Sequence, residues 1–371
     1  MKQEVAVIIP YYHNDLSVTE QISYEQCKKV LHSFPIIFVV PKNFRIELKE
    51  LPEKWDVVEV PAQWMSDVEA YNQMMLNKEF YQFFQQYRYI LIHQLDVYVF
   101  SDRLLEFCRY DYDYIGAPWI EGKFEAKLAE KGVLYVGNGG FSLRKVESCL
   151  KQLEKENLEQ VRYNEDVFWA SRTEDFKLAP KEVAWQFSFE RPVKTLYKLN
   201  GEQLPFGCHA WMKYNLDFFR PYIANDGYSM VWDIHYEPQG DSTNEYADRR
   251  CLTASKSVVW RSLLNSCEIV PRMIWIYGAG NYGMLCGYLL RDLDDCKVAY
   301  VDKNEEKWGK SMWEIPIMPP KEIAHTNGTL VIVAMKYTET VVRELSEKGY
   351  RRENDLLEFS MLVHAINSEM P

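Results

Sequence analysis

The chain has 371 residues, of which 47% are hydrophobic and 26% are charged, and its formal net charge at pH 7 is −11. This usage is typical of globular proteins, and at roughly 100–200 residues per domain it favours two domains. The acidic balance argues against nucleic acid as a partner, because neutralising phosphates requires a basic surface.

Cysteine usage and hydropathy indicate the compartment. The eight cysteines are scattered without a CxxC pair, which fits a reducing cytosol and argues against a cysteine-based zinc site. The N-terminal apolar run is too short for a signal peptide, and no run approaches the roughly 18 apolar residues of a transmembrane segment. We therefore expect a soluble cytoplasmic protein without a transmembrane segment, able to lie peripherally on the inner face of the membrane.

The first hundred residues predict strands alternating with helices. Continuous β-branched runs at 5–10, 35–41 and 55–61 predict buried parallel strands, and helical spacing follows at 16–31 and 64–86. This alternation predicts an α/β fold with a parallel sheet. Ligands of such sheets bind outside the carboxyl ends of the strands.

The next strand, "YILIHQLDVYVF" at 89–100, carries an acid near its middle, Asp96. A buried carboxylate costs several kcal/mol unless it is paired or binds a cation. A strand that ends near Asp96 and directs it into a cleft would remove this cost, so we predict that Asp96 contacts a ligand or a cation.

The remaining sequence predicts a second, smaller domain. Residues 133–145 read as a strand broken by a glycine-rich turn, 164–172 as a short helix opening with two acids, and 225–250 as a polar segment rich in turns. From residue 272 a strand, a glycine-rich turn, a helix and further strands restart the α/β pattern. We predict a first domain at 1–225, a linker with a connecting helix at 226–271, and a doubly wound domain at 272–371.

Several motifs occur in an informative order on this frame. They are Gln94-x-Asp96, Gly139-Gly140, Glu165-Asp166 and His209. This order resembles that of GT-A fold glycosyltransferases. The blocks "IPYY", "YILIHQLDVYVF", "YIGAPW", "VGNGGFSLRK", "NEDVFW" and "PFGCHAW" more closely resemble a bacterial family catalogued as a domain of unknown function and placed among glycosyltransferases, over residues 4 to 220.

The resemblance implies a GT-A-like domain that binds a nucleotide sugar, followed by a Rossmann-like domain. It also implies an inverting transfer of a sugar from a nucleoside-diphosphate sugar to a glycan, lipid-linked or protein-linked saccharide, in the biosynthesis of bacterial surface polysaccharide. A departing diphosphate needs a cation or fixed positive groups. A divalent metal, Mn or Mg, is expected on Asp96 and His209. Gln94 stands where such motifs often carry an acid, so the metal is expected to bind weakly or through the substrate.

The resemblance also implies roles for other residues. Asp166 is the expected base, supported by Glu165, which either assists it or contacts the acceptor; the alternative is that the two acids cap a helix. Gly139 and Gly140 are expected to let backbone approach the sugar, or to form an ordinary turn. The donor pocket is expected to include Tyr11, Tyr12, Tyr71 and Asn72, with core or surface positions as the alternative.

The C-terminal motif has the spacing of a dinucleotide site. Gly278, Gly280 and Gly283 follow a strand and open a helix, and Asp302 ends the next strand. NAD or another nucleotide is the ligand this spacing predicts, and Gly280→Val is expected to damage the turn. However, the domain is about half the usual length and has no Tyr-x-x-x-Lys set for hydride transfer. A structural or regulatory role, or contact with a second copy of the chain, is the alternative.

Two other functions stay open from the sequence. The first is an NAD-dependent oxidoreductase that modifies nucleotide sugars at Gly278–Asp302. The second is a protein that binds a nucleotide or glycan without catalysis, which the neutral Gln94 would suit.

Overall fold

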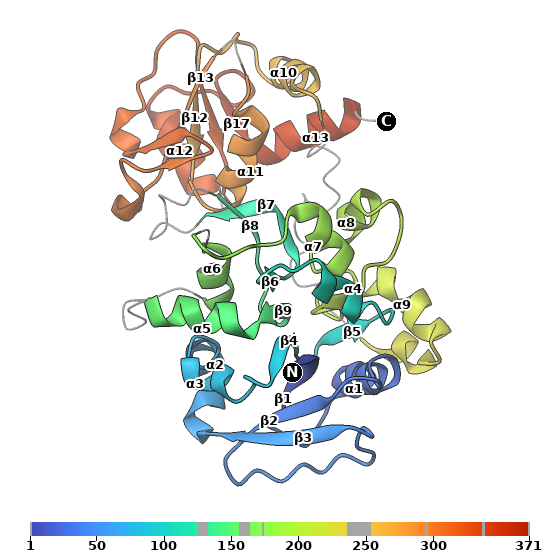
Figure 1. The fold of residues 1–371 in the computed structure, drawn as a ribbon. Helices are drawn as coiled ribbons and strands as arrows, with labels where there is room; N and C mark the ends of the chain where they lie inside the picture. Colours follow the sequence, from blue (N-terminus) through green and yellow to red (C-terminus); the bar gives the residue numbers. More distant parts are fainter. Residues whose placement is uncertain are drawn as a thin grey trace. The chain divides into compact units, whose positions relative to one another are not determined.

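The structure is a computed structural model that describes residues 2–124, 133–155, 164–172, 174–235, 254–293, 296–335 and 338–369. It divides into two compact units (Figure 1). Unit 1 comprises Met1–Trp119 and Val136–Thr243, and unit 2 comprises Ile120–Tyr135 and Asn244–Pro371. Relative to the predicted boundaries, unit 2 also takes up a segment from the middle of the chain. Residues 236–253 of the predicted linker lie outside the described residues.

The main sheet of unit 1 has the strand order β3–β2–β1–β4–β9–β6. Strands β3, β2, β1 and β4 are parallel, and β9 is antiparallel to both β4 and β6. The strands span Gln3–Pro10 (β1), Ile36–Pro41 (β2), Trp55–Val60 (β3), Tyr87–His93 (β4), Tyr114–Ile115 (β6) and Phe141–Lys145 (β9). The chain leaves β1 toward β2 on one side and returns to β4 on the other, so the topological switch point lies between β1 and β4.

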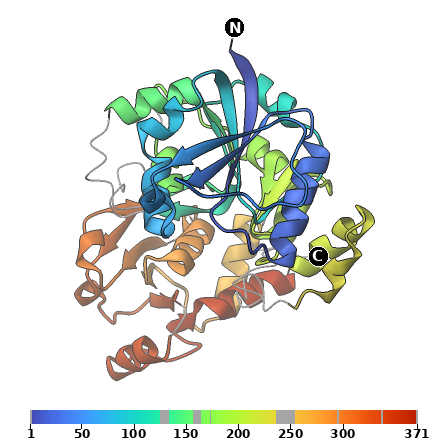
Figure 2. The same cartoon turned by 90° about the horizontal axis from the view of Figure 1, so that it is seen from below.

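Helices cover both faces of this sheet, because alternate residues of each buried strand face opposite sides. Val5, Val7 and Ile9 of β1 pack in one core with α1 (Val18–Val30), α4 (Leu104–Arg109) and α7 (Lys181–Phe187). Ala6 and Ile8 pack in the other core with other helices of unit 1. Those helices are α2 (Val68–Met75), α3 (Lys78–Gln82), α5 (Val146–Lys155) and α6 (Glu165–Ala170). Figure 2 shows helices on both sides of this sheet.

The predicted helix at 64–86 is three shorter elements: the 3₁₀ turn η1 (Ala62–Met65), α2 and α3. Asp67 accepts a hydrogen bond from the Ala70 N–H (2.8 Å), and Asn77 accepts one from the Glu79 N–H (2.9 Å). Each side chain satisfies a backbone donor that a helix start leaves free, so each begins a new helix.

A small second sheet of unit 1 has the order β10–β11–β5 and spans Ser188–Phe189, Gly207–His209 and Val97–Val99. The predicted strand at 89–100 therefore divides into β4 and β5, with Asp96 in the connection. The other elements described in the first 243 residues are the paired strands β7 (Pro118–Phe124) and β8 (Val133–Val136), the helices α8 (Val193–Leu199) and α9 (Leu216–Asn225), and the 3₁₀ turn η4 (Ser229–Asp233).

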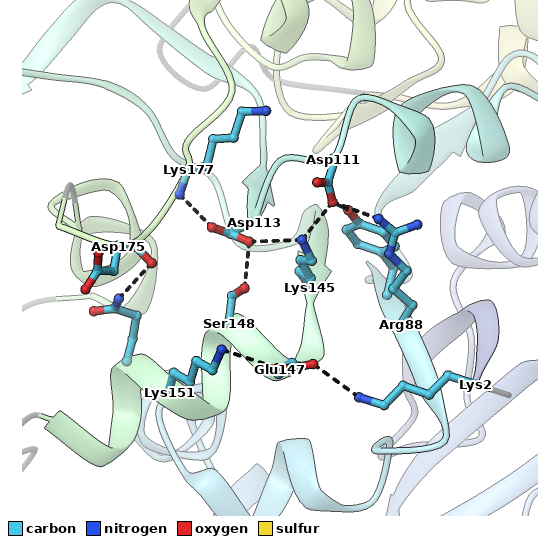
Figure 3. A network of polar contacts seen from close by, with 12 residues as sticks. Lys2, Arg88, Asp111, Asp113, Lys145, Glu147, Ser148, Lys151, Asp175 and Lys177 are labelled. Atoms are coloured by element: carbon cyan, nitrogen blue, oxygen red, sulfur yellow. Dashed lines mark hydrogen bonds and ion pairs between the residues drawn. The ribbon is translucent and has the colours of Figure 1, made fainter.

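A polar network ties β4, β9 and α5 together at the edge of unit 1 (Figure 3). Asp111 accepts hydrogen bonds from Arg88 (2.8 Å) and Lys145 (2.7 Å). Asp113 accepts one from the Ser148 hydroxyl (2.6 Å) and one from the Lys177 N–H (2.7 Å). These contacts hold β9 against α5, and β9 carries the glycine turn described below at its start.

Unit 2 is also a sheet between two helical layers, with the strand order β14–β15–β13–β12–β16–β17. All neighbours are parallel except β14 and β15. The strands span Met273–Tyr277 (β12), Lys297–Val301 (β13), Ser311–Met312 (β14), Ile315–Met318 (β15), Thr329–Val333 (β16) and Leu356–Glu358 (β17). The helices are α10 (Lys256–Asn265), α11 (Asn281–Leu290), α12 (Glu339–Glu347) and α13 (Phe359–Glu369), with 3₁₀ turns η6 (Glu305–Lys307) and η7 (Pro320–Glu322).

The α/β class predicted from the sequence is confirmed in both units. Among the described residues, none of the helices has the length and apolar character needed to cross a bilayer.

Candidate functional site

Unit 1 has a cavity of about 700 Å³ at the carboxyl ends of β1 and β4, which is the switch point of its sheet. Pro10 ends β1 and Tyr12 follows it, and Gln94, Leu95 and Asp96 follow β4. The remaining described lining residues come from the start of α1, the η1–α2 segment and the turn after β11: Ser17, Thr19, Glu20, Met65, Ser66, Asp67, Val68, Tyr71, Met212 and Lys213. The location is the one that α/β sheets use for ligands.

The pairing of β5 with β11 brings His209 to Asp96. His209 is the register partner of Val97, which follows Asp96 in the chain. As a result, His209 Nε2 lies 3.2 Å from Asp96 Oδ1 and 3.3 Å from Gln94 Oε1. The structure therefore brings together three residues that the sequence predicted for one site.

A second carboxylate lies on the other side of His209. Glu190 Oε1 is 3.5 Å from His209 Nδ1, and the Asn138 side-chain nitrogen is 3.1 Å from the same atom. On the opposite edge of the cluster, Lys213 Nζ donates a hydrogen bond to Asp96 Oδ2 (2.9 Å). His209 thus lies between two acids, and Asp96 lies between two cationic groups.

The charges of this cluster stabilise one another. Burial lowers the pKa of His209, but Asp96 and Glu190 outweigh it and raise that pKa to about 10. Burial raises the pKa of Asp96, but His209 and Lys213 outweigh it and hold that pKa well below its usual range. At neutral pH Asp96, Glu190, His209 and Lys213 are therefore all charged, and the two negative charges offset the two positive charges.

The residues around Asp96 fit a divalent cation. Asp96 Oδ1 is buried and, among the described residues, makes no hydrogen bond, although it lies close to His209. Two ligands at right angles on a cation with bonds of about 2.0–2.1 Å are about 3 Å apart, which is close to the separations of His209 Nε2 from Asp96 Oδ1 and from Gln94 Oε1. Imidazole, amide and carboxylate together suit a Mn-like ion. His209 would have to release its Nε2 proton to serve as a ligand.

This donor set contains only one carboxylate. Within the described ranges, no three His, Cys, Asp or Glu side chains are arranged to hold a metal. The neutral Gln94 is the third donor here, so a cation would gain little charge from the protein alone.

Gly139 and Gly140 lie directly against the site, because neighbouring side chains occupy the space of a Cβ atom. A Cβ on Gly140 would lie 2.2 Å from His209 Nε2 and 2.6 Å from Gln94 Oε1, and a Cβ on Gly139 would lie 1.5 Å from Glu165 Oε1. The close approach that the sequence predicted is thus made by the protein's own side chains. An approach to a sugar stays a prediction.

The two acids of the Glu165-Asp166 pair have different surroundings. Glu165 is buried, and its Oε2 lies 3.0 Å from Arg144 Nη2. Asp166 is partly exposed, and its Oδ1 accepts a hydrogen bond from the Val167 N–H (2.7 Å). Glu165 is therefore placed to support the site from within the core, whereas Asp166 is the acid with access to solvent.

The predicted donor-binding residues separate into two groups. Tyr12 and Tyr71 line the cavity, and the buried Tyr71 hydroxyl makes no hydrogen bond to any described residue. Tyr11 instead lies in the core, with its ring 5.7 Å from that of Phe38. The Asn72 side chain accepts a hydrogen bond from the Glu165 N–H (2.8 Å), so it satisfies the start of α6 and is not among the lining residues.

Sequence reasoning missed Lys213 and Glu190. Lys213 belongs to a turn in which its N–H donates to the Ala210 carbonyl (2.8 Å), and Ala210 has a positive φ of 51°. A lysine four positions after the candidate ligand His209 is the one signal that could have drawn attention. Glu190 follows β10, and its proximity to His209 comes from the pairing of β10 with β11.

The glycine turn of unit 2, which begins at Gly278, is held by hydrogen bonds of the Asp302 carboxylate. Asp302 Oδ2 accepts hydrogen bonds from the Ala279 N–H (2.7 Å) and Lys307 Nζ (3.1 Å), and Asp302 Oδ1 accepts one from the Asn304 N–H (2.8 Å). Gly278 has a positive φ of 103°, and a Cβ on Gly283 would lie 1.8 Å from the Gly278 carbonyl oxygen. A Cβ on Gly280 would meet no heavy atom within 4 Å. A Cβ at position 280 therefore meets no obstacle, and both the damage from Gly280→Val and nucleotide binding here stay predictions.

Comparisons with known proteins give a family match and a structural match. The family described as "Protein of unknown function (DUF5672)" matches residues 54–209. This range includes Gln94, Asp96, the glycine turn, the acid pair and His209, and it is shorter than the resemblance seen in the sequence. No curated protein matches the chain.

Among solved structures, the chain matches the apo-form glycosyltransferase GlyE of Streptococcus pneumoniae TIGR4. The identity is 12%, the match covers 100% of each chain, and the TM-score is 0.36. A match of this size identifies neither the fold nor the activity.

Proposed function

We propose that unit 1 transfers a sugar from a nucleoside-diphosphate sugar to a hydroxyl group of a glycan or glycoconjugate. The observation that carries this proposal is the cavity at the switch point between β1 and β4, with Asp96 on its wall. A diphosphate leaving group needs positive charge beside it, and the cation-compatible donors and Lys213 stand at this point. The motif order in the sequence supports the same reaction.

We assign each part of the sugar donor to different residues of the cavity. The apolar and aromatic lining residues of the cavity, among them Tyr12, Met65 and Val68, suit the flat nucleoside. The diphosphate lies at Asp96, Gln94 and Lys213. Asp96, His209 and Gln94 would hold a divalent cation, Mn or Mg, which when bound would neutralise charge on the leaving diphosphate.

The transfer step needs a base on the acceptor side. In an inverting reaction the acceptor oxygen forms a bond to the anomeric carbon, the bond from that carbon to the diphosphate oxygen breaks, and the diphosphate leaves with the electron pair. Asp166 takes the proton of the acceptor hydroxyl. Gly139 lies against Glu165, and the next residue, Gly140, lies against His209. The start of α6 is therefore close to the cation-compatible cluster.

The proposed biological setting depends on the resemblance of the sequence motifs to a bacterial family placed among glycosyltransferases. We propose a cytoplasmic enzyme of bacterial surface polysaccharide biosynthesis, acting on a free, lipid-linked or protein-linked saccharide at the inner face of the membrane. Unit 2 would serve as a structural or regulatory appendage, with self-association as one role. Asp302 is already hydrogen-bonded within the protein, which favours this assignment over an oxidoreductase.

A donor screen tests the proposal. Full-length protein is heated with a panel of nucleoside-diphosphate sugars, with and without manganese, because a bound ligand raises the melting temperature according to its concentration relative to Kd. Each stabilising donor is then assayed for release of nucleoside diphosphate with saccharide acceptors. Stabilisation followed by turnover is expected. Stabilisation without turnover across the acceptors would favour the binding protein that lacks catalysis, and binding of NAD with hydride transfer would favour the oxidoreductase.

A further inference from the structure

Lys213 places a positive charge on the cavity wall. Its Nζ lies 2.9 Å from Asp96 Oδ2, and its side chain is 48% exposed. Of the described residues that line the cavity, Lys213 alone carries a cationic side chain. The ammonium group therefore has room for a second, anionic partner on its solvent side.

The other two acids of the cavity are engaged by backbone and hydroxyl donors. Glu20 accepts hydrogen bonds from the Ser17 N–H (2.8 Å) and the Ser17 hydroxyl (2.7 Å) at the start of α1. Asp67 accepts hydrogen bonds from the Ala70 N–H (2.8 Å) and the Ser66 hydroxyl (3.0 Å) at the start of α2. Acids at helix starts are partly compensated by the helix dipole, so Glu20 and Asp67 repel an anion at Lys213 less than two uncompensated carboxylates would.

We infer that Lys213 binds the diphosphate directly, so that this cavity accepts a diphosphate without a metal. The inference rests on the proposed function for the identity of the anion. Its physical basis is the neutral Gln94, which leaves one carboxylate in the cation-compatible set, together with the lysine that faces the same cavity. A lysine ammonium is a compact charge that suits phosphate oxygens. A divalent cation then strengthens binding but is not required for it.

The position of Lys213 makes Asp96 a competitor of the diphosphate. Asp96 directs Oδ1 toward His209 and Oδ2 toward Lys213. A diphosphate must share the ammonium group with Oδ2. Removing the charge of Asp96 therefore has opposite effects under two conditions: it weakens binding that depends on a metal, and it strengthens binding that depends on Lys213 alone.

Inorganic pyrophosphate is the probe, titrated calorimetrically into the full-length protein in EDTA. The wild type is expected to bind, and Lys213→Met is expected to bind about 10–100-fold more weakly, the usual range for losing a charge-assisted contact. Lys213→Arg keeps the charge and should stay within a few-fold of the wild type. Lys151→Met, which removes a lysine paired with Glu147 on α5 (Figure 3), is the control and should leave affinity unchanged.

Two Asp96 variants separate direct contact from an indirect effect. Asp96→Asn should tighten pyrophosphate binding several-fold in EDTA and remove its enhancement by manganese. Asp96→Asn/Lys213→Met should bind as weakly as Lys213→Met. Wild-type affinity in the double variant would mean that Lys213 acts only by neutralising Asp96, and would overturn the inference. Absence of binding to the wild type in EDTA, or an unchanged Lys213→Met, would also overturn it.

These outcomes are independent of the donor screen. Pyrophosphate binding that requires Lys213, found together with no turnover of any donor, would leave this inference standing and remove the proposed function. Turnover with strict metal dependence and no effect of Lys213→Met on pyrophosphate would do the reverse.

Discussion

The carboxylate of Glu165 lies 3.0 Å from the guanidinium of Arg144, and their side chains are 5% and 0% exposed. Arg144 also donates hydrogen bonds to the Ser142 hydroxyl (2.9 Å), the Tyr81 hydroxyl (2.9 Å) and the Gly139 carbonyl (3.2 Å). Because buried charges are stable only when paired and hydrogen-bonded, this arrangement fixes Gly139 and the start of α6 as one unit.

Breaking this pair is expected to destabilise unit 1 strongly. Arg144→Met leaves the Glu165 carboxylate buried without its partner, which typically costs about 3–5 kcal/mol. The free energy of unfolding, measured by urea titration, checks this value. The exposed pair of Lys155 and Asp175 (3.4 Å) provides the control, and Lys155→Met should cost less than about 1 kcal/mol. Similar losses in the two variants would mean that the buried pair has no special role.

Asp166→Asn is expected to lower turnover by about 10²–10⁴-fold, the usual effect of losing a general base. Donor affinity should change little, because the expected contact of Asp166 is with the acceptor hydroxyl. Rates at saturating donor, together with donor Kd from calorimetry, separate the two effects. Turnover close to that of the wild type would contradict the assignment of Asp166 as the base.

His93 makes the stability of unit 1 depend on pH. Its ring is fully buried and neither ring nitrogen makes a hydrogen bond to the described residues. Burial lowers the pKa of His93 to about 4. Below pH 6.5 His93 becomes protonated in the unfolded chain, but in the folded chain it stays neutral down to about pH 4. The free energy of unfolding therefore decreases as the pH falls through this window.

The expected loss from this group between pH 6.5 and pH 5 is about 2 kcal/mol, at 1.36 kcal/mol per pH unit. Urea titrations at pH 7, 6 and 5 measure it. His93→Phe keeps an aromatic ring beside Phe141, which contacts His93 edge-to-face at 6.0 Å, and removes the titration. The variant should therefore show a shallower dependence on pH, and parallel curves for the two proteins would contradict the prediction.

The sequence was sufficient for the buried strands of the sheet and for the position of Asp96 just after one of them, for a local reason. Continuous apolar runs such as 5–10 and 35–41 leave few alternatives to buried strands, and an acid placed after such a run must either leave the core or be paired. It was insufficient for the surroundings of Asp96, because these come from pairing over long separations: the His209 contact with Gln94 spans 115 positions. No local pattern encodes the register of β5 with β11 that creates this contact.

Tyr11 and Tyr12 illustrate the same limit at the scale of one residue. Both follow β1 in sequence, yet Tyr11 is fully buried and Tyr12 is 53% exposed. Alternation along an extended backbone sends neighbouring side chains to opposite sides, and here Tyr11 packs beside Phe38 and Phe44 whereas Tyr12 lines the cavity.

The glycines of unit 2 provide a matched comparison. Gly283→Ala would bring a methyl group to 1.8 Å from the Gly278 carbonyl oxygen, which is backbone and cannot rotate away, whereas Gly280→Ala would place it in open space. Overpacking of this kind usually costs about 1–3 kcal/mol. Gly280 also has a φ of −104°, which alanine adopts without strain. We expect Gly283→Ala to lower the melting temperature by several degrees and Gly280→Ala to change it little, as measured by thermal unfolding of the full-length chain. Equal losses would show that Gly280, too, is required by the turn, as the sequence motif alone predicts.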